Sequence, residues 1–255
     1  MPNKNLWICF FALILLSQTN SFAQPVRENQ KNVQVVKMNL LALITRDFSF
    51  QYERQFASHF SAALGFRFQP YGNLPFRKTI LDQVSNSGLA TRDFINTAKV
   101  SNWAVTPELR YYFFKKKPLN GLYVGPYFRI GEYRLGGTYL FVDDSGDVKP
   151  IVFKGKGMAW SVGIQVGAQW KLSEKISLDW WILGPQYGVM NTKLHADVDL
   201  TDLDYYEKKR LNVVLNGVSI GGNTMTSDIR DYSIDSKINL KFVGLRTGLS
   251  LGFVF

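Results

Sequence analysis

Strict alternation of apolar and polar residues marks the eighteen residues from Ile238 to Phe255. One face carries the mainly apolar set Val243, Leu245, Thr247, Leu249, Leu251, Phe253 and Phe255, and the other carries Phe242, Gly244, Arg246, Gly248, Ser250 and Gly252. A strand with an apolar face opposite a face of glycine, serine and arginine is typical of a membrane barrel wall. We interpret Phe253 and Phe255 as a C-terminal signal for the barrel-assembly machinery.

The same period of two recurs along the chain and predicts eight strands. Their approximate ranges are 34–45, 47–56, 59–69, 102–114, 121–134, 158–171, 175–184 and 238–255. In the sixth strand, Trp160 and Trp170 are ten residues apart on the apolar face, which corresponds to roughly 23 Å of membrane at a 45° tilt. We expect these rings to form an aromatic girdle at the two interfaces. The predicted fold class is all-β: an eight-stranded antiparallel up-and-down transmembrane β-barrel.

The lengths of the connections alternate, as they do in outer-membrane barrels with short periplasmic turns and longer external loops. The links near residues 57–58, 115–120 and 172–174 are short, and those at 70–101, 135–157 and 185–237 are long. The barrel is therefore expected to span 34–255 with these three loops outside and both termini in the periplasm. The link at Arg46-Asp47 is unexpectedly tight.

The last loop carries two competing local signals. Asn216-Gly217 lies between residues 211–215 and 218–220 and predicts an external hairpin with a type I′ turn. The segment Thr201 to Asp204 could instead cap a short helix that continues through Arg210.

The first residues have the layout of a secretory signal peptide. Lys4 precedes the apolar run from Leu6 to Leu16, and Ser21-Phe22-Ala23 provides a small-residue cleavage site. We expect residues 1–23 to be removed and 24–33 to form a periplasmic segment. Eleven apolar residues are too few to cross a hydrocarbon core roughly 30 Å thick.

Composition narrows the function classes. The net charge of +10 could indicate nucleic acid, but the basic residues are spread through strands and turns and form no nucleic-acid-binding motif. Anionic outer-membrane lipid, including lipopolysaccharide, is the expected partner of a cationic barrel. We expect a bacterial outer-membrane location and no nucleic-acid partner.

The less apolar face of each strand places charged residues inside the barrel. The predicted lumen set is Lys37, Glu53, Arg67, Glu108, Arg110, Arg129, Asp179 and Arg246. An eight-stranded barrel has room only for side chains, so these charges are expected to pair and fill the lumen. The alternative is a narrow anion-favouring channel that uses the surplus positive charge.

Candidate catalytic and metal-binding residues are few. His195 lies near Asp197, Asp199 and Ser219 and is the one candidate for a lipid-modifying site, although a solvated loop histidine is the simpler interpretation. Two acidic segments lack the spacing of a calcium loop: Asp143, Asp144 and Asp147, and Asp197, Asp199, Asp202 and Asp204. We expect no catalytic residue, metal or cofactor. Aromatic residues at period two are expected to contact lipid: Phe48, Phe50, Tyr52, Phe60, Phe66, Phe68, Tyr111 and Phe113.

Three segments, Lys37 to Leu43, Thr106 to Tyr112 and Gly121 to Tyr133, resemble the DUF3575-like family of small Bacteroidota outer-membrane barrels, whose function is not known. The resemblance runs in strand order over about the whole mature chain. It implies an outer-membrane barrel and supplies no activity or catalytic residues. More distantly, the architecture is similar to OmpX and OmpA barrels, without the periplasmic domain of the latter.

We therefore expect a non-enzymatic outer-membrane barrel with a filled lumen, which stabilises the envelope or contacts an external ligand through its loops. The rival interpretations are a narrow solute or anion channel, a lipid-modifying enzyme, and a soluble lipocalin-like barrel with its apolar face turned inward.

Overall fold

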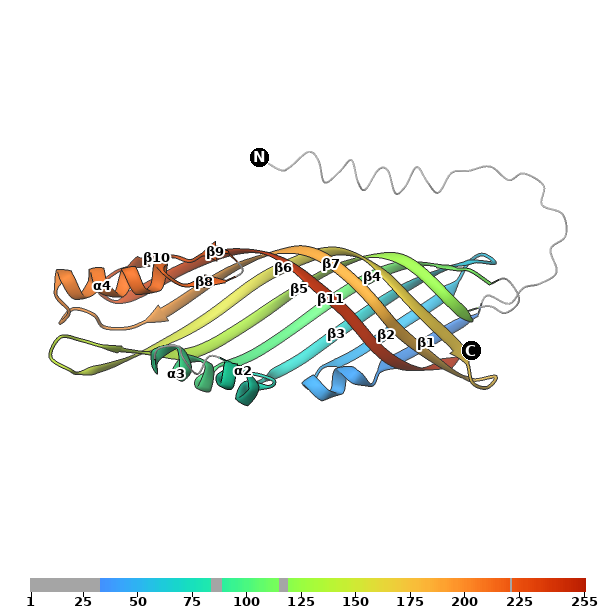
Figure 1. The fold of residues 1–255 in the computed structure, drawn as a ribbon, viewed down its shortest axis with the longest axis horizontal. Coiled ribbons are helices and arrows are strands. Elements are labelled where there is room, and N and C mark those ends of the chain that lie inside the picture. The colour runs from blue at the N-terminus through green and yellow to red at the C-terminus, as the bar shows by residue number, and fades with distance from the viewer. Residues whose placement is uncertain (1–32, 84–88, 115–118, 221) are drawn as a thin grey trace, which may run out of the picture. The chain divides into compact units, whose positions relative to one another are not determined.

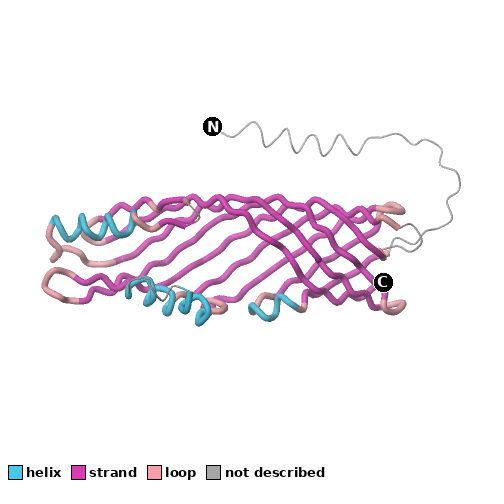
Figure 2. Tube along the Cα trace, viewed as in Figure 1, coloured by secondary structure: helices cyan, strands magenta, loops and turns pink. Residues whose placement is uncertain are grey.

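The computed structural model describes residues 33–83, 89–114, 119–220 and 222–255. The predicted signal peptide and residues 24–32 lie outside this part of the chain. Strands dominate the described residues (Figure 2). No helix among the described residues is long and apolar enough to cross a membrane.

Eight strands form a closed antiparallel ring (Figure 1). They are β1 (Gln34–Asn39), β2 (Phe48–Gln55), β3 (Phe60–Asn73), β4 (Lys99–Tyr112), β5 (Gly121–Val142), β6 (Val148–Lys171), β7 (Ile176–Asp197) and β11 (Ser233–Val254). Each strand pairs with the next in this order, and β1 pairs with β11 to close the ring, with Val35 opposite Val254. The eight-stranded up-and-down barrel predicted from the alternation is confirmed.

The wall of the ring is apolar outside and polar inside. On β11, Val243 and Leu245 are 81% and 64% exposed, whereas the side chain of Arg246 points inward and the residue is 6% exposed. The aromatic residues predicted to contact lipid all lie on the exposed face: Phe48, Phe50, Tyr52, Phe60, Phe66, Phe68, Tyr111 and Phe113. A soluble ligand-binding barrel needs the reverse arrangement.

Short turns join β2 to β3 and β6 to β7 at one end of the ring, which we call the turn end. The other end, the head end, carries the longer connections. There, α2 (Arg77–Gln83) and α3 (Leu89–Thr97) follow β3, and α4 (Tyr205–Asn216), β8 (Ser219–Ile220), β9 (Asn223–Thr224) and β10 (Thr226–Ile229) follow β7. Strand β10 pairs with β11, with Ser227 opposite Ser236, and adds a ninth strand to the sheet.

The strands β5, β6, β7 and β11 are far longer than predicted. Residues 135–157 were expected to be a loop, but β5 and β6 continue through most of that range and meet in a tight turn at 143–147. Residues 185–197 and 233–237 likewise belong to β7 and β11, and residues 70–73 and 99–101 belong to β3 and β4. The three long loops predicted at 70–101, 135–157 and 185–237 are therefore shorter than expected, because the strands continue beyond the length that a membrane requires.

These extensions form a small folded unit at the head end, residues 138–153 and 194–238, which we call the head. Its apolar core is Phe141, Ile151, Phe153, Ala196, Leu200, Leu203, Leu211, Leu215, Met225, Ile234 and Ile238. Helix α4 packs on the inner face of the extended sheet through Leu211 and Leu215, which are four residues apart and share one helix face. The head therefore has a core separate from the lumen.

The hairpin predicted at Asn216-Gly217 is wrong, and a helix occupies its place. The Asp204 side chain accepts a hydrogen bond from the Glu207 backbone N–H at 2.8 Å, and the Glu207 side chain accepts one from the Asp204 N–H at 2.9 Å. This capping box begins α4, and Gly217 follows its last residue. The alternative helix expected after Asp204 is the one that forms, and it extends beyond Arg210.

The first strand is shorter than predicted. A 3-10 helix, η1 (Leu41–Thr45), follows β1 because the Asn39 side chain accepts a hydrogen bond from the Ala42 N–H at 3.2 Å and turns the chain. Arg46 then takes a left-handed conformation with φ 62°. Residues 40–47, not Arg46-Asp47 alone, make the first link at the head end.

Candidate functional site

The barrel brings together most of the charged residues that alternation places inside. Lys37 (β1), Glu53 (β2), Glu108 and Arg110 (β4), Asp179 (β7) and Arg246 (β11) form one network that crosses the lumen. Their side chains are at most 5% exposed. Three basic and three acidic groups meet, so the network balances its own charge.

Asp179 and Glu53 are the two acceptors at the centre of this network. Asp179 Oδ2 lies 2.5 Å from Lys37 Nζ and 2.7 Å from Arg110 Nη1. Glu53 Oε2 also pairs with Lys37 and lies 3.1 Å from Arg110 Nη1. Lys37 and Arg110 therefore each pair with both of these carboxylates, which compensates for their removal from water.

Glu108 links this centre to β11. Its Oε1 accepts from Arg110 Nε at 2.6 Å, and its Oε2 accepts from Arg246 Nη1 at 2.7 Å. The Arg246 guanidinium also stacks on the ring of Trp181, with 4.0 Å from Cζ to the ring centroid. The network thus runs from β1 across to β11 without a gap in bonding.

Uncharged side chains complete the network, and the sequence analysis did not identify them. Tyr112 and Tyr123 donate their hydroxyls to Glu53 and Asp179, each at 2.8 Å. Gln51 accepts from Arg110 Nη2 at 2.9 Å, and Gln169 accepts from Lys37 at 2.7 Å. The alternation could have identified two of them. Gln51 is two residues before Glu53, and Tyr112 is two residues after Arg110, so each lies on the same strand face as a predicted lumen charge.

Glycines in β6 leave room for two of the tyrosine rings. Tyr123 and Tyr127 of β5 lie opposite Gly167 and Gly163. A Cβ atom at Gly167 would lie 2.4 Å from the Tyr123 ring, and one at Gly163 would lie 2.5 Å from the Tyr127 ring. The lumen is therefore filled by rings and ion pairs at the turn end.

A cavity of about 660 Å³ lies beside this network toward the head end, lined by residues that include Asp47, Arg67, Arg129 and Arg246. Arg67 is paired with Asp47 through two bonds, Nε to Oδ1 at 3.0 Å and Nη2 to Oδ2 at 2.8 Å. Arg129 donates to Thr106 Oγ1 at 3.1 Å and has no carboxylate partner among the described residues. Arg67 and Arg129, both predicted in the lumen, therefore lie outside the network. Asp47 balances the charge of Arg67, and no described carboxylate pairs with Arg129.

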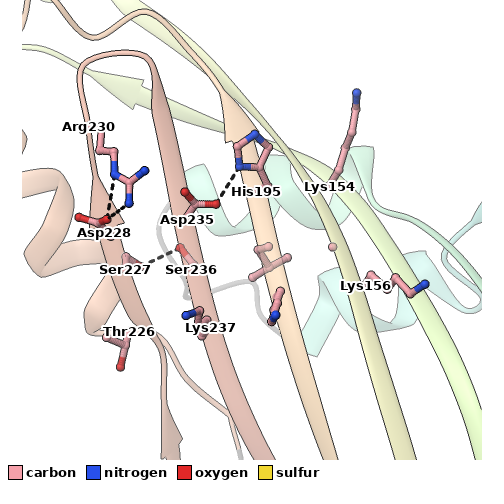
Figure 3. A pocket seen from close by; sticks show the side chains of 13 residues that line it. Lys154, Lys156, His195, Thr226, Ser227, Asp228, Arg230, Asp235, Ser236 and Lys237 are labelled. Carbon is pink, nitrogen blue, oxygen red and sulfur yellow. Dashed lines mark hydrogen bonds and ion pairs between the residues drawn. The ribbon is translucent and has the colours of Figure 1, made fainter. Parts of the chain in front are cut away.

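In the head, His195 of β7 is exposed and lies beside Asp235 of β11 (Figure 3). Its Nδ1 contacts Asp235 Oδ1 at 2.8 Å and its Nε2 contacts Asp197 Oδ1 at 3.0 Å. Hydrogen bonds first to Asp235 and then to Asp197 raise the pKa of His195 above its ordinary value of 6.5. Both ring nitrogens face carboxylates, an arrangement that suits a cross-strand ion pair.

The two acidic segments are divided among separate structural roles. Asp143 accepts the Asp147 N–H at 2.8 Å in the β5–β6 turn, and Asp144 pairs with Arg210 of α4 at 2.5 Å. Asp199 accepts from the Thr201 hydroxyl at 2.7 Å, and Asp202 pairs with Lys149. Among the described residues, no group of three or more His, Cys, Asp or Glu side chains converges as metal ligands do.

The apolar band on the outer wall marks the membrane-embedded zone. Trp160 and Trp170 of β6 are 46% and 40% exposed on its outer face, with the exposed residues Val162, Ile164 and Val166 between them. Phe253 and Phe255 are exposed at the turn end of the wall. The geometry is that of an outer-membrane barrel, with an apolar outer surface and a polar interior.

A family model described as "Protein of unknown function (DUF3575)" matches residues 8–195. The comparison with curated proteins gives no match. Among solved structures, a major outer membrane protein from Thermus thermophilus is similar at 14% identity, with a TM-score of 0.35, over 88% of this chain and 98% of that one. The outer membrane protease OmpT of Escherichia coli is similar at 11% identity, with a TM-score of 0.38, over 94% and 100%. The N-terminal β-barrel domain of Pseudomonas aeruginosa OprF is similar at 10% identity, with a TM-score of 0.24, over 89% and 98%.

Proposed function

The chain belongs to the DUF3575 family and is a bacterial outer-membrane β-barrel, and we propose that it displays its folded head at the cell surface to contact an external protein. The role proposed is binding, without catalysis. The observation that carries it is the head itself, a unit with its own apolar core and helix, on a barrel whose lumen is filled at the turn end.

The orientation follows from the connections. Outer-membrane barrels keep short turns in the periplasm and longer segments outside. The turn end holds the tight β2–β3 and β6–β7 connections, and the head end holds α2, α3 and α4. We therefore place the head outside the cell.

The surface of the head has the composition of a protein-contact site. Tyr205 and Tyr206 of α4 are 72% and 74% exposed and contact each other edge to face, with 5.5 Å between ring centroids. Tyr232, just before β11, is also exposed, and Val213 is exposed on α4. Exposed tyrosines are enriched where proteins bind each other, because they bury a large area at a low cost in side-chain entropy.

Two observations support this role over the rival ones. The His195 ring nitrogens face carboxylates, and a Ser–His catalytic pair needs one nitrogen free for the hydroxyl. The network side chains fill the lumen at the turn end of the described barrel, and a filled lumen opposes the passage of a solute. Planar-bilayer recordings of the purified barrel are therefore expected to show no ion conductance.

Photo-crosslinking on intact cells tests the proposal. Tyr206 is replaced by the photoreactive amino acid p-benzoylphenylalanine, and the matched control carries it at Tyr187, which is exposed on the apolar outer wall of β7. A protein adduct is expected from position 206 and not from position 187. Absence of any adduct at 206 in a correctly folded, surface-exposed protein overturns the proposal.

A head deletion provides a second test. Asp197 and Ser233 are directly opposite each other at the ends of β7 and β11, so a two-residue Asn-Gly turn can replace residues 198–232. This protein is expected to keep the heat-dependent gel mobility of a folded barrel and to lose the contact. Retained binding by the deleted protein would show that the head is not the contact surface.

A further inference from the structure

Four basic side chains form one row across the outer face of the wall, where the apolar band meets the head. In the strand register, Arg134 of β5 is opposite Lys156 of β6, Lys156 is opposite Lys193 of β7, and Lys193 is opposite Lys237 of β11. All four are exposed. Figure 3 shows Lys154, Lys156 and Lys237 on this part of the wall.

The row carries more positive charge than its neighbours balance. Glu132 is the carboxylate that pairs with it, at 2.8 Å from Arg134 Nε and 2.8 Å from Lys156 Nζ. Lys193 and Lys237 have no ion pair within the part of the chain that the structure describes, so the row with Glu132 has a net charge of +3. Like charges directly opposite each other on a sheet are destabilising, which leaves a stabilising role for an anionic ligand.

The height of the row corresponds to the lipid headgroups. Lys156 is four residues beyond Trp160 on the same face of β6, or about 9 Å above the aromatic border at a 45° tilt. Met158 and Trp160, both exposed, continue the same face into the apolar band. A lipid whose acyl chains lie against this band would carry its headgroup beside the row.

The residues of the row also line a hollow. A concavity of about 650 Å³ is bordered by Lys156, Lys193 and Lys237, with His195 and Asp235 on its head side. The row crosses three strand spacings, about 14 Å, and is inclined to the membrane because the strands are tilted. It therefore suits a headgroup with more than one phosphate better than a single small anion.

We propose that this row binds the phosphorylated sugar headgroup of the outer-leaflet glycolipid, the lipid A part of lipopolysaccharide. The inference uses the orientation given above and is independent of whether the head contacts a protein. In this proposal the phosphate groups of the lipid balance the excess positive charge of the row. Lys193 and Lys237 are the residues that bind phosphate, because Arg134 and Lys156 already pair with Glu132.

Native mass spectrometry of the detergent-solubilised full-length protein with diphosphoryl lipid A tests this assignment. The variant K193Q/K237Q is expected to weaken binding about 30-fold, since each basic group near an anionic lipid surface contributes about 1 kcal/mol. The control K171Q/K175Q removes two exposed lysines at the turn end and is expected to bind like the wild type. Equal weakening by both variants, or no weakening by K193Q/K237Q, overturns the proposal.

A competition experiment distinguishes binding of the lipid from binding of a free anion. Millimolar inorganic phosphate is expected to leave the lipid A complex intact, because phosphate lacks the acyl chains that contact the apolar band. Displacement of lipid A by phosphate would assign the row to a small anion and overturn the lipid proposal. A photo-crosslink at Tyr206 reports on the head alone, so failure of one proposal is distinguishable from failure of the other.

Discussion

Asp179 offers the sharpest test of the buried network, through its replacement by asparagine. Its carboxylate accepts four bonds: from Lys37 at 2.5 Å, Arg110 at 2.7 Å, Tyr123 at 2.8 Å and Trp181 Nε1 at 3.1 Å. Asparagine has nearly the same shape, but its amide N–H₂ would face donors where a second oxygen accepted before. The change therefore removes the charge and leaves the packing almost unaltered.

The expected loss is large because the remaining charges no longer balance. The network changes from three acids and three bases to two acids and three bases, and all the groups near Asp179 are fully buried. Removing one partner of a buried pair typically costs about 3–5 kcal/mol. We expect the Asp179→Asn barrel to lose a similar amount of unfolding free energy.

A second substitution separates charge imbalance from a lost contact. In the double variant Lys37→Met/Asp179→Asn, two acids face two bases again, so the free energy of unfolding is expected to recover by about 2 kcal/mol relative to Asp179→Asn. The control Asp199→Asn alters an exposed carboxylate that bonds Thr201, and its effect is expected to stay within about 0.5 kcal/mol.

Equilibrium unfolding in urea, followed by tryptophan fluorescence in phospholipid vesicles, measures these differences. The temperature at which the folded gel band disappears gives an independent ranking. An Asp179→Asn barrel within about 1 kcal/mol of the wild type would refute the argument that ion pairing sustains the filled lumen. So would a double variant that is less stable than Asp179→Asn.

Three further predictions concern the head and the wall. Leu211→Ala is expected to cost about 2–5 kcal/mol of head stability, because Leu211 is fully buried; limited proteolysis on cells should cut its α4 faster than that of the exposed-site control Val213→Ala. The pKa of His195 is raised, so the stabilisation of the head by this residue is fully present below pH 6.5 and declines as the pH rises through the folded pKa. Protease resistance of the head, measured against pH, is therefore expected to lose this decline in His195→Gln. The same pH dependence in His195→Gln and the wild type would contradict the prediction. Gly167→Val is expected to displace the Tyr123 ring, whose Cζ would lie 2.4 Å from a new Cβ, and to lower the barrel melting temperature, whereas Gly146→Ala, in the open β5–β6 turn, tests only backbone strain.

The ring of strands and the residues on its inner face could be predicted from the sequence, because apolar and polar residues alternate with a period of two along each strand. Alternation placed Arg246 inside and Val243 outside without knowledge of any partner strand, and the structure agrees. Period alone gives no height along the barrel, so it cannot show which charges meet. Asp47 pairs with Arg67 and was missed because it lies in a link, and Arg129 lies on the predicted face but donates to Thr106 instead of a carboxylate.

The sequence pattern did not predict the head, for a different reason. Beyond the membrane the inner face of β6 becomes apolar, with Ile151 and Phe153 buried in the core that includes Leu211 of α4, and Val152 is exposed on the outer face. A membrane-strand pattern therefore ends near residue 158, although the strand does not. Asn216-Gly217 has the sequence of a tight hairpin turn, but the capping box at Asp204 and the burial of Leu211 and Leu215 stabilise a helix up to Asn216.

Four of the eight strands, β5, β6, β7 and β11, form part of the apolar wall, carry the basic row and continue as the sheet of the head. A contact surface built on continuous strands is held by the register of the barrel, and α4 is held to that sheet by a buried core. Binding through such a surface orders little of the chain, so less of the contact energy is lost to entropy than with a flexible loop. A lipid bound at the basic row would steady the same strands just below the head. The position of the row thus couples anchoring in the outer leaflet to presentation of the head, and K193Q/K237Q should increase proteolysis of α4 on cells even though neither lysine belongs to the core of the head.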